Sequence, residues 1–195
     1  IGLPWSVLGF WNALIGLWLL HGRSDDGMDQ VAPFARAGNT RDPVTVKTAI
    51  LMTLRNEDPA RAFARLRIVK QSVDATGQGA QYSYFILSDT NVAEVGAAEE
   101  EMTSQWRASM SADDAARVIY RRRTDNTGYK AGNVRDFCER WGHEFELMLP
   151  LDADSLMSGE SIVRMTRMMQ AYPKLGILQS LVVGMPSSSA FARIF

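Results

Sequence analysis

The sequence predicts an α/β fold in which a mostly parallel sheet carries helices on both faces. Short apolar runs typical of strands alternate with longer segments whose apolar residues recur at helical spacing. The alternation is regular from residue 48 onward, which indicates parallel strands joined by right-handed crossovers. The 195 residues are 46% hydrophobic, which suffices for the packed core of one domain, with or without an appendage.

The composition excludes several classes of protein. The chain has 21 Lys and Arg against 22 Asp and Glu, so it is no strongly basic nucleic-acid binder and we expect no nucleic-acid partner. One cysteine and two histidines exclude an intrachain disulfide and leave too few ligands for a Cys/His zinc site. Because the chain does not begin with Met, we expect it to be a fragment of a longer protein.

The first residues form the most apolar part of the chain. Residues 1–20 carry no charge and include three tryptophans, and as a helix they would span roughly 30 Å, the thickness of a bilayer's hydrocarbon core. A buried core helix is an alternative, whereas a signal peptide would need a basic leader and a cleavage site. We expect a transmembrane helix over 1–21. Residues 22–46 are polar with scattered Gly and Pro and are predicted to be a linker.

The first strand is predicted over 48–54, where the sequence is an apolar run. After it, Asp58 can cap a helix whose first residue is Pro59. Apolar residues then recur at helical spacing until Gly77, at Phe63, Leu66, Val69 and Val73. A second strand over 82–87 precedes a helix with an apolar face of Val92, Val95, Met102 and Trp106.

Three further strands and two helices follow along the chain. The third strand, 117–120, leads into a basic loop over 121–133 that contains glycine. The next helix ends at Gly142 and has an apolar stripe of Val134, Phe137, Cys138 and Trp141. The fourth strand, 145–151, is followed by a helix that stops at Pro173, and a fifth strand is predicted over 176–183.

Polar side chains follow the carboxyl ends of these strands. They are Asn56 and Glu57, Asp89, the 121–133 loop, and Asp152 with Asp154. Each on its own is an ordinary turn or cap residue. In open parallel sheets, however, ligands bind outside the carboxyl ends of the strands, so four such positions in register indicate a ligand site.

The pair Asp152 and Asp154 is the most informative of these groups. Side chains two residues apart in an extended chain point the same way, so both carboxylates can bind one hard cation. Mg²⁺ and Mn²⁺ prefer oxygen ligands and keep positions for water and substrate phosphates, so a diphosphate could complete the shell. The alternative is that Asp154 is a turn or cap residue before the helix near Ser158.

Positive charge lies beside this acidic pair, in the 121–133 loop. Gly128 and Gly132 allow close backbone approach, and Lys130 is placed just before a helix N-terminus, where phosphate binds well. Neither the Gly-x-x-x-x-Gly-Lys-Ser/Thr nucleotide loop nor the Gly-x-Gly-x-x-Gly dinucleotide pattern occurs after the first strand. ATPases and dehydrogenases are therefore disfavoured.

Several of these segments together resemble one bacterial family. They are Thr48-Ala-Ile-Leu-Met52, Asn56-Glu-Asp58, Leu87-Ser-Asp-Thr90, Tyr120-Arg-Arg-Arg123, Lys130-Ala-Gly-Asn133, Asp136-Phe-Cys138, Arg140-Trp-Gly142 and Leu151-Asp-Ala-Asp-Ser-Leu-Met-Ser-Gly159. Over 46–195 the chain resembles the glucans biosynthesis glucosyltransferase H family, family-2 glycosyltransferases of the inner membrane that make osmoregulated periplasmic glucans from UDP-glucose. Lys-Ala-Gly-Asn and Asp-x-Asp alone would reach only the wider group that includes cellulose synthases.

The resemblance implies a GT-A-like fold, with 47–195 as the N-terminal part of a family-2 catalytic domain. It implies a UDP-glucose donor, a growing glucan acceptor, inversion at the anomeric carbon, and Mg²⁺ or Mn²⁺. It also implies the bacterial inner membrane as the location, with the catalytic domain in the cytoplasm. The implied roles are the nucleotide pocket for Asn56 and Glu57, uridine for Asp89, the nucleotide or diphosphate for Lys130, ribose or metal for Asp152, and metal for Asp154.

The sequence also departs from the family pattern and leaves alternatives open. The stretch Thr53-Leu-Arg55 replaces a Pro-containing one, and neither the later acidic motif nor Gln-x-x-Arg-Trp occurs before Phe195, so we assign no catalytic base. Another processive β-glucan synthase would differ in acceptor and linkage. A phosphohydrolase would use Asp-x-Asp as nucleophile and acid, but expects it on the first strand. The third alternative is a non-catalytic nucleotide-binding fragment.

Overall fold

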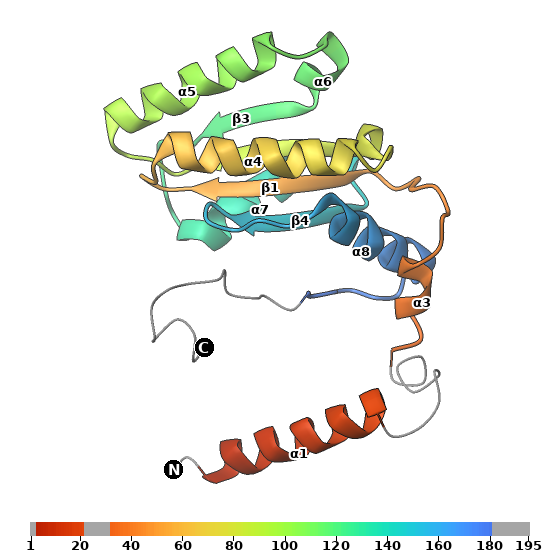
Figure 1. Cartoon of the computed structure of the whole chain (residues 1–195). Helices are drawn as coiled ribbons and strands as arrows, with labels where there is room; N and C mark the ends of the chain where they lie inside the picture. The colour runs from red at the N-terminus through yellow and green to blue at the C-terminus, as the bar shows by residue number, and fades with distance from the viewer. Residues whose placement is uncertain (1–2, 22–31, 181–195) are drawn as a thin grey trace.

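The computed structural model describes residues 3–21 and 32–180, and its centre is a four-stranded, all-parallel sheet (Figure 1). The strands are β1 (Thr48–Leu54), β2 (Tyr82–Ser88), β3 (Val118–Arg122) and β4 (Leu147–Asp152). Their order across the sheet is β3-β2-β1-β4, and every neighbouring pair is parallel. The predicted α/β class with a parallel sheet is therefore confirmed.

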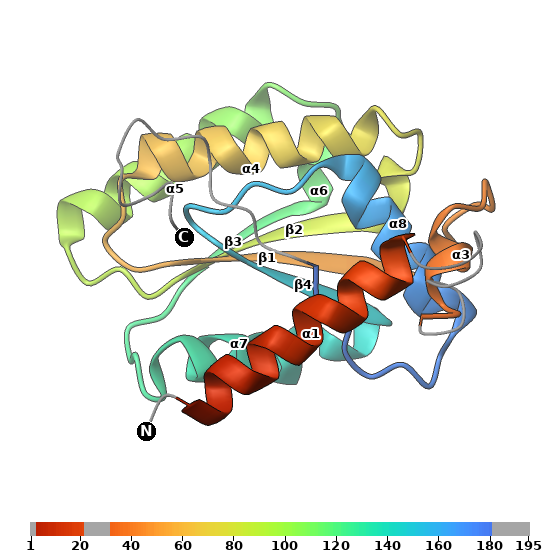
Figure 2. The same cartoon turned by 60° about the horizontal axis from the view of Figure 1, so that its bottom comes forward.

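Helices cover both faces of this sheet, as predicted (Figure 2). The helices α4 (Pro59–Asp74), α5 (Ala93–Ala108) and α8 (Gly159–Ala171) pack on one face, and α7 (Tyr129–Trp141) packs on the other. Alternate residues of each strand feed the two cores because side chains alternate along a strand. In β1, Ile50 and Met52 join the larger core, whereas Ala49 and Leu51 contact the layer built around Phe137 of α7.

Side-chain caps fix where two of these helices begin, and the one at Asp58 was predicted. The Asp58 carboxylate accepts hydrogen bonds from the amides of Ala60 (2.9 Å) and Arg61 (3.3 Å), and Pro59 is the first residue of α4. Ser158 caps α8 in the same way through the amide of Ser161. A cap oxygen satisfies amides that have no partner within the helix, so Asp58 and Ser158 define the first turns of α4 and α8.

Short elements that the sequence analysis did not identify are α3 (Ala35–Gly38), α6 (Ala112–Ala116) and the 3-10 turns at Gly79–Gln81 and Gly142–Glu144. The helix α3 lies within the segment predicted as a linker and packs against α8 (Figure 1). The same segment is tied to α8 by hydrogen bonds from the Thr45 amide to Gln170 Oε1 (2.8 Å) and from Arg167 Nε to the Asp42 carbonyl (2.7 Å). Residues 32–46 thus lie against the last described helix.

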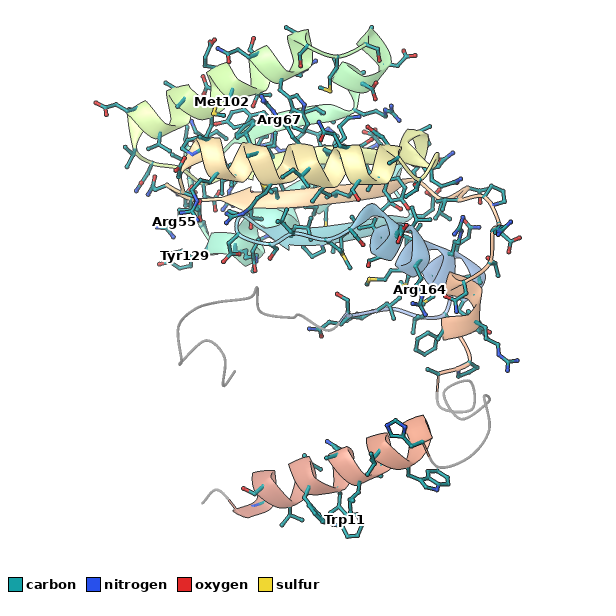
Figure 3. All side chains as sticks on the ribbon, in the orientation of Figure 1. Trp11, Arg55, Arg67, Met102, Tyr129 and Arg164 are labelled. Carbon is teal, nitrogen blue, oxygen red and sulfur yellow. The ribbon has the colours of Figure 1, made fainter. Side chains whose placement is uncertain are left out.

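The N-terminal helix α1 (Leu3–His21) forms where a transmembrane helix was predicted. Its apolar side chains are largely exposed, and Trp11 points away from the sheet (Figure 3). Among the residues that the structure describes, however, no helix is long and apolar enough to cross a membrane. The predicted transmembrane helix over 1–21 is therefore not supported.

Three further predictions need correction. The helix α7 begins at Tyr129, so Lys130 lies in its first turn and the predicted 121–133 loop is much shorter. Cys138 is exposed on α7 rather than part of its buried stripe. Residues 176–180, the described part of the predicted fifth strand, form no strand, and Ile177 is 86% exposed; residues 181–183 lie outside the described residues.

Candidate functional site

A pocket of about 450 Å³ opens at the carboxyl ends of β1 and β4. The chain adds β2 and then β3 on one side of β1 and then returns to place β4 on the other side. Connections that leave in opposite directions create a crevice at such a switch point, where open α/β sheets bind ligands. Five of the six predicted site residues line this pocket: Glu57, Asp89, Lys130, Asp152 and Asp154.

The two aspartates of the Asp-x-Asp pair share this pocket and are both exposed in it. Asp152 is the last residue of β4, and its carboxylate forms an ion pair with the ammonium of Lys130 from the first turn of α7. Asp154 forms no hydrogen bond or ion pair with any residue in the described part of the chain. The pocket therefore contains one carboxylate without a protein partner.

The carboxylates present suit a cation that is held only partly by protein. Within 3–21 and 32–180, no three or more His, Cys, Asp or Glu side chains gather as a metal site. Asp152 and Asp154 are hard oxygen ligands, and Mg²⁺ is commonly bound by one or two carboxylates with substrate phosphates and water. These residues thus fit Mg²⁺ or Mn²⁺ together with a diphosphate, and they do not form a complete cage for the metal alone.

Asp89 lies at the opposite wall and is almost fully buried. Arg123 binds it with two hydrogen bonds, from Nε to Oδ1 (2.7 Å) and from Nη2 to Oδ2 (2.6 Å). The hydrogen bond to Asp89 raises the pKa of Arg123, although desolvation opposes this. The Asp89 amide also bonds to the Leu54 carbonyl (2.8 Å), and Asn126 bonds to the Asp89 carbonyl (2.6 Å). Hydrogen bonds therefore hold the carboxylate, the amide and the carbonyl of Asp89 in place.

Asn56 does not line the pocket but joins the two loops beside it. Its backbone has φ 61°, a left-handed conformation that Asn tolerates better than most residues. Its side-chain oxygen accepts from the amides of Asn91 and Val92 (both 3.1 Å), and its Nδ2 donates to Asn91 Oδ1 (2.7 Å). Within the same loop, the Glu57 carboxylate accepts from the Arg55 amide. Asn56 thus clamps the loop after β1 to the loop after β2.

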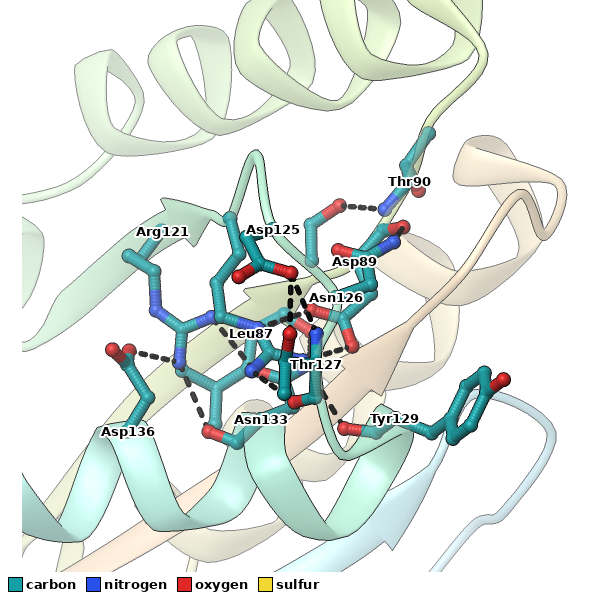
Figure 4. Close-up of polar contacts among 12 residues, drawn as sticks. Leu87, Asp89, Thr90, Arg121, Asp125, Asn126, Thr127, Tyr129, Asn133 and Asp136 are labelled. Atoms are coloured by element: carbon teal, nitrogen blue, oxygen red, sulfur yellow. Dashed lines mark hydrogen bonds and ion pairs between the residues drawn. The ribbon is translucent and has the colours of Figure 1, made fainter.

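The segment Lys130-Ala-Gly-Asn133 positions Lys130 by packing the start of α7 closely against the loop before it. A Cβ on Gly132 would lie 2.0 Å from the Thr127 carbonyl oxygen, so only glycine fits there. Asn133 is buried, donates to the Leu87 carbonyl (2.9 Å) and accepts from Arg121 Nη1 (2.6 Å) (Figure 4). Because α7 is fixed in this way to the end of β2, Lys130 reaches across to β4.

Three residues that line the pocket were not predicted as site residues: Arg55, Tyr129 and Asn133. Tyr129 is 68% exposed with φ 49°, and the Arg55 guanidinium lies 5.3 Å from the centre of its ring (Figure 3). An exposed aromatic ring that contacts a cation and lines a pocket is a suitable surface for a planar or sugar group. Asn133 ends the Lys130-Ala-Gly-Asn133 segment that carries the family resemblance, so this segment could have pointed to Asn133 as a pocket residue. No sequence pattern marks Tyr129.

Comparisons with known proteins identify related sequences. No protein-family model matches the chain. It is 41% identical over 188 residues to a glucans biosynthesis glucosyltransferase H of Caulobacter vibrioides (strain NA1000 / CB15N), covering 95% of this chain and 27% of that protein. Proteins with the same name in Pseudomonas aeruginosa (strain LESB58) and Pseudomonas savastanoi pv. phaseolicola are 36% and 38% identical over 192 residues, each covering 97% of this chain and 22% of the relative.

The resemblance inferred from the short segments is therefore confirmed, and it extends beyond 46–195 to nearly the whole chain. The chain spans about a quarter of the length of these curated relatives.

Proposed function

We propose that this chain is the donor-binding part of a glucosyltransferase of glucan synthesis, with UDP-glucose as the donor. The names of the relatives support the glucosyltransferase. The observation that carries the donor site is the pocket between β1 and β4, in which the unpaired Asp154 carboxylate lies with the exposed pair of Lys130 and Asp152. A sugar nucleotide needs positive charge near its diphosphate. Lys130 can supply its own ammonium, and the two aspartates can hold a divalent cation.

We assign the residues of the pocket to the parts of the donor as follows. Asp89, rigid and buried at the β2 end, and Glu57 contact the uridine side, and Asn56 shapes that wall. Lys130 exchanges its exposed partner Asp152 for the diphosphate. Asp152 and Asp154 hold Mg²⁺ or Mn²⁺ through their carboxylates, and the bound ion would offset negative charge on the departing UDP.

The reaction we propose is a single displacement that inverts the anomeric carbon. The acceptor hydroxyl oxygen forms a bond to that carbon, the bond from carbon to the phosphate oxygen breaks, and its electron pair leaves with UDP. The hydroxyl proton passes to a general base, for which we assign no residue. The ammonium of Lys130 compensates the charge that develops on UDP. The product is a β-linked glucan extended by one glucose.

Calorimetric titration of UDP-glucose into the chain with Mg²⁺ tests the donor site. The proposal expects saturable binding that Asp154→Ala abolishes, whereas equal affinity in that variant would contradict the assignment. Assays of phosphate release from a phosphomonoester test the phosphohydrolase alternative, which is disfavoured because the pair lies at the end of the fourth strand and not of the first. Binding without glucose transfer would leave the non-catalytic alternative.

The GT-A and family-2 classification and the inner-membrane location with a cytoplasmic catalytic domain are further proposals, supported by the resemblance alone. Protease treatment of intact spheroplasts and of inverted vesicles tests the orientation. Protection in spheroplasts and cleavage in inverted vesicles is the expected result, and the reverse would contradict it.

A further inference from the structure

Glu99 of α5 carries a fully buried carboxylate that is reached by hydroxyl groups. Three hydrogen bonds end on it, from Ser88 Oγ (2.6 Å), Thr90 Oγ1 (2.7 Å) and Tyr120 Oη (2.9 Å). Within 3–21 and 32–180 it has no ion pair with a cation. Burying a carboxylate that has no ion pair lowers stability. Filling the core therefore does not explain why a glutamate is at this position, and its hydrogen bonds suggest another role.

The carboxylate sets the direction of a chain of hydrogen bonds that leads to the pocket. A carboxylate only accepts, so each hydroxyl must donate its proton to Glu99. The hydroxyl oxygens are then available to accept from backbone amides: Ser88 Oγ accepts from the Thr90 amide (3.1 Å), and Thr90 Oγ1 accepts from the Asn56 amide (3.0 Å). Burial and the hydrogen bond with Glu99 both raise the pKa of Tyr120, so this phenol keeps the proton that it donates.

Both amides belong to segments that form the pocket wall. Ser88 and Thr90 flank Asp89, so one carboxylate anchors the residues on each side of that aspartate. Asn56 lies in the loop after β1, between Arg55 and Glu57, which both line the pocket. A single buried group thus connects the loop after β2 with the loop after β1.

We propose that Glu99 is a positioning residue of the donor site, which acts through Thr90 and Asn56 to hold the two loops in register. This inference rests on the proposed function, because the loops matter only if the pocket binds the donor. Glutamine has nearly the same shape as glutamate but replaces one acceptor oxygen with a donor NH₂ group. Each hydroxyl that faces this NH₂ group would have to accept instead of donating: Thr90 if the group replaces Oε1, and both Ser88 and Tyr120 if it replaces Oε2. The order of donors and acceptors would then break at Thr90 or at Ser88.

The test compares UDP-glucose affinity, measured by calorimetry with Mg²⁺, in Glu99→Gln, Thr90→Val and the double variant. Each single variant should weaken binding by about tenfold, the cost of one misdirected buried hydrogen bond. The double variant should bind no more weakly than the weaker single variant, because both changes break the same connection. Wild-type affinity in Glu99→Gln, or strictly additive losses, would overturn the proposal.

Thr103→Val is the matched control. Thr103 is buried on the same helix and donates to the Glu99 carbonyl (2.8 Å), so its loss weakens α5 without touching the chain of bonds to the pocket. Its affinity should equal that of the unchanged protein, and a loss equal to that of Glu99→Gln would show a merely structural role. If Glu99→Gln does not fold, the UDP-glucose affinities of Thr90→Ser and Thr90→Val are compared instead. Serine keeps the hydroxyl and should keep the affinity that valine loses. Equal affinities in these two variants would overturn the proposal.

Amide hydrogen exchange separates this inference from the proposed function. If the unchanged chain does not bind UDP-glucose, the proposed function fails, and the exchange rate of the Asn56 amide decides the inference alone. Faster exchange of this amide in Glu99→Gln than in Thr103→Val supports the positioning role. Equal rates in the two variants overturn it.

Discussion

The two walls of the pocket are built differently. At the β2 wall, the pair of Arg123 and Asp89 has side chains only 10% and 4% exposed. At the β4 wall, the pair of Lys130 and Asp152 is 55% and 59% exposed. A buried pair is costly to break because the remaining charge is left without water, whereas an exposed pair exchanges its partners at little cost. The first wall therefore presents a fixed surface, whereas the second can exchange its ion pair for contacts with a ligand.

The comparison is tested most strongly by removing one charge from each wall. Asp89→Asn leaves the Arg123 guanidinium buried without its counter-charge, and we expect it to lower the free energy of unfolding by about 3–5 kcal/mol. Asp152→Asn, at the exposed wall, should change it by less than about 1 kcal/mol. Urea denaturation of both variants measures the difference. Similar losses in the two would contradict the assignment of separate roles.

The close contact at the start of α7 gives the next largest effect. Gly132→Ala would bring a Cβ to 2.0 Å from the Thr127 carbonyl, which forces the backbone to move, and we expect a loss of about 1–3 kcal/mol. Gly142→Ala is the matched control at the other end of α7, because its Cβ would lie 3.6 Å from Cys138, an ordinary contact. Thermal denaturation that shows equal shifts for the two alanine variants would mean that the close approach at Gly132 is not required.

The smallest expected effect concerns the acid sensitivity of the fold at Asp114, which does not line the pocket. Hydrogen bonds from Lys70 and Ser111 lower the pKa of Asp114 to about 2 from its ordinary 3.8. A lowered pKa stabilises the fold fully above 3.8 and loses that contribution as the pH falls toward about 2. Asp114→Asn should remove this part of the pH dependence of the melting temperature. An unchanged pH profile in the variant would show that Asp114 does not contribute.

Much of the framework could be predicted because its signals are local. The strand at Thr48–Leu54 is a continuous apolar run, and Asp58 with Pro59 marks the start of α4. The carboxyl-end rule then placed Glu57, Asp89 and the Asp-x-Asp pair at one edge, where the structure brings them together. These inferences need only the period of the apolar residues and the topology of parallel sheets.

The remaining features depend on contacts between distant residues. Arg123 and Asp89 are 34 positions apart, and periodicity indicates a face of the sheet but not the partner of a side chain. The start of α7 was placed too late because Gly128, in a left-handed conformation, makes no side-chain cap there, and helix starts are recognised by such caps. Glu99 reads as an ordinary charge on α5 until the fold buries it beneath Ser88 and Thr90.

The central claim is that the exposed wall binds a sugar nucleotide through Asp154 and a divalent ion. Calorimetric titration of UDP-glucose with and without Mg²⁺, in the unchanged chain, in Asp154→Asn and in Asp113→Asn, tests it most directly. Asp113 is an exposed carboxylate outside the pocket, so its variant carries the same change of charge. We predict that Mg²⁺ strengthens binding in the unchanged chain and in Asp113→Asn but not in Asp154→Asn. An equal effect of Mg²⁺ in all three would contradict the claim.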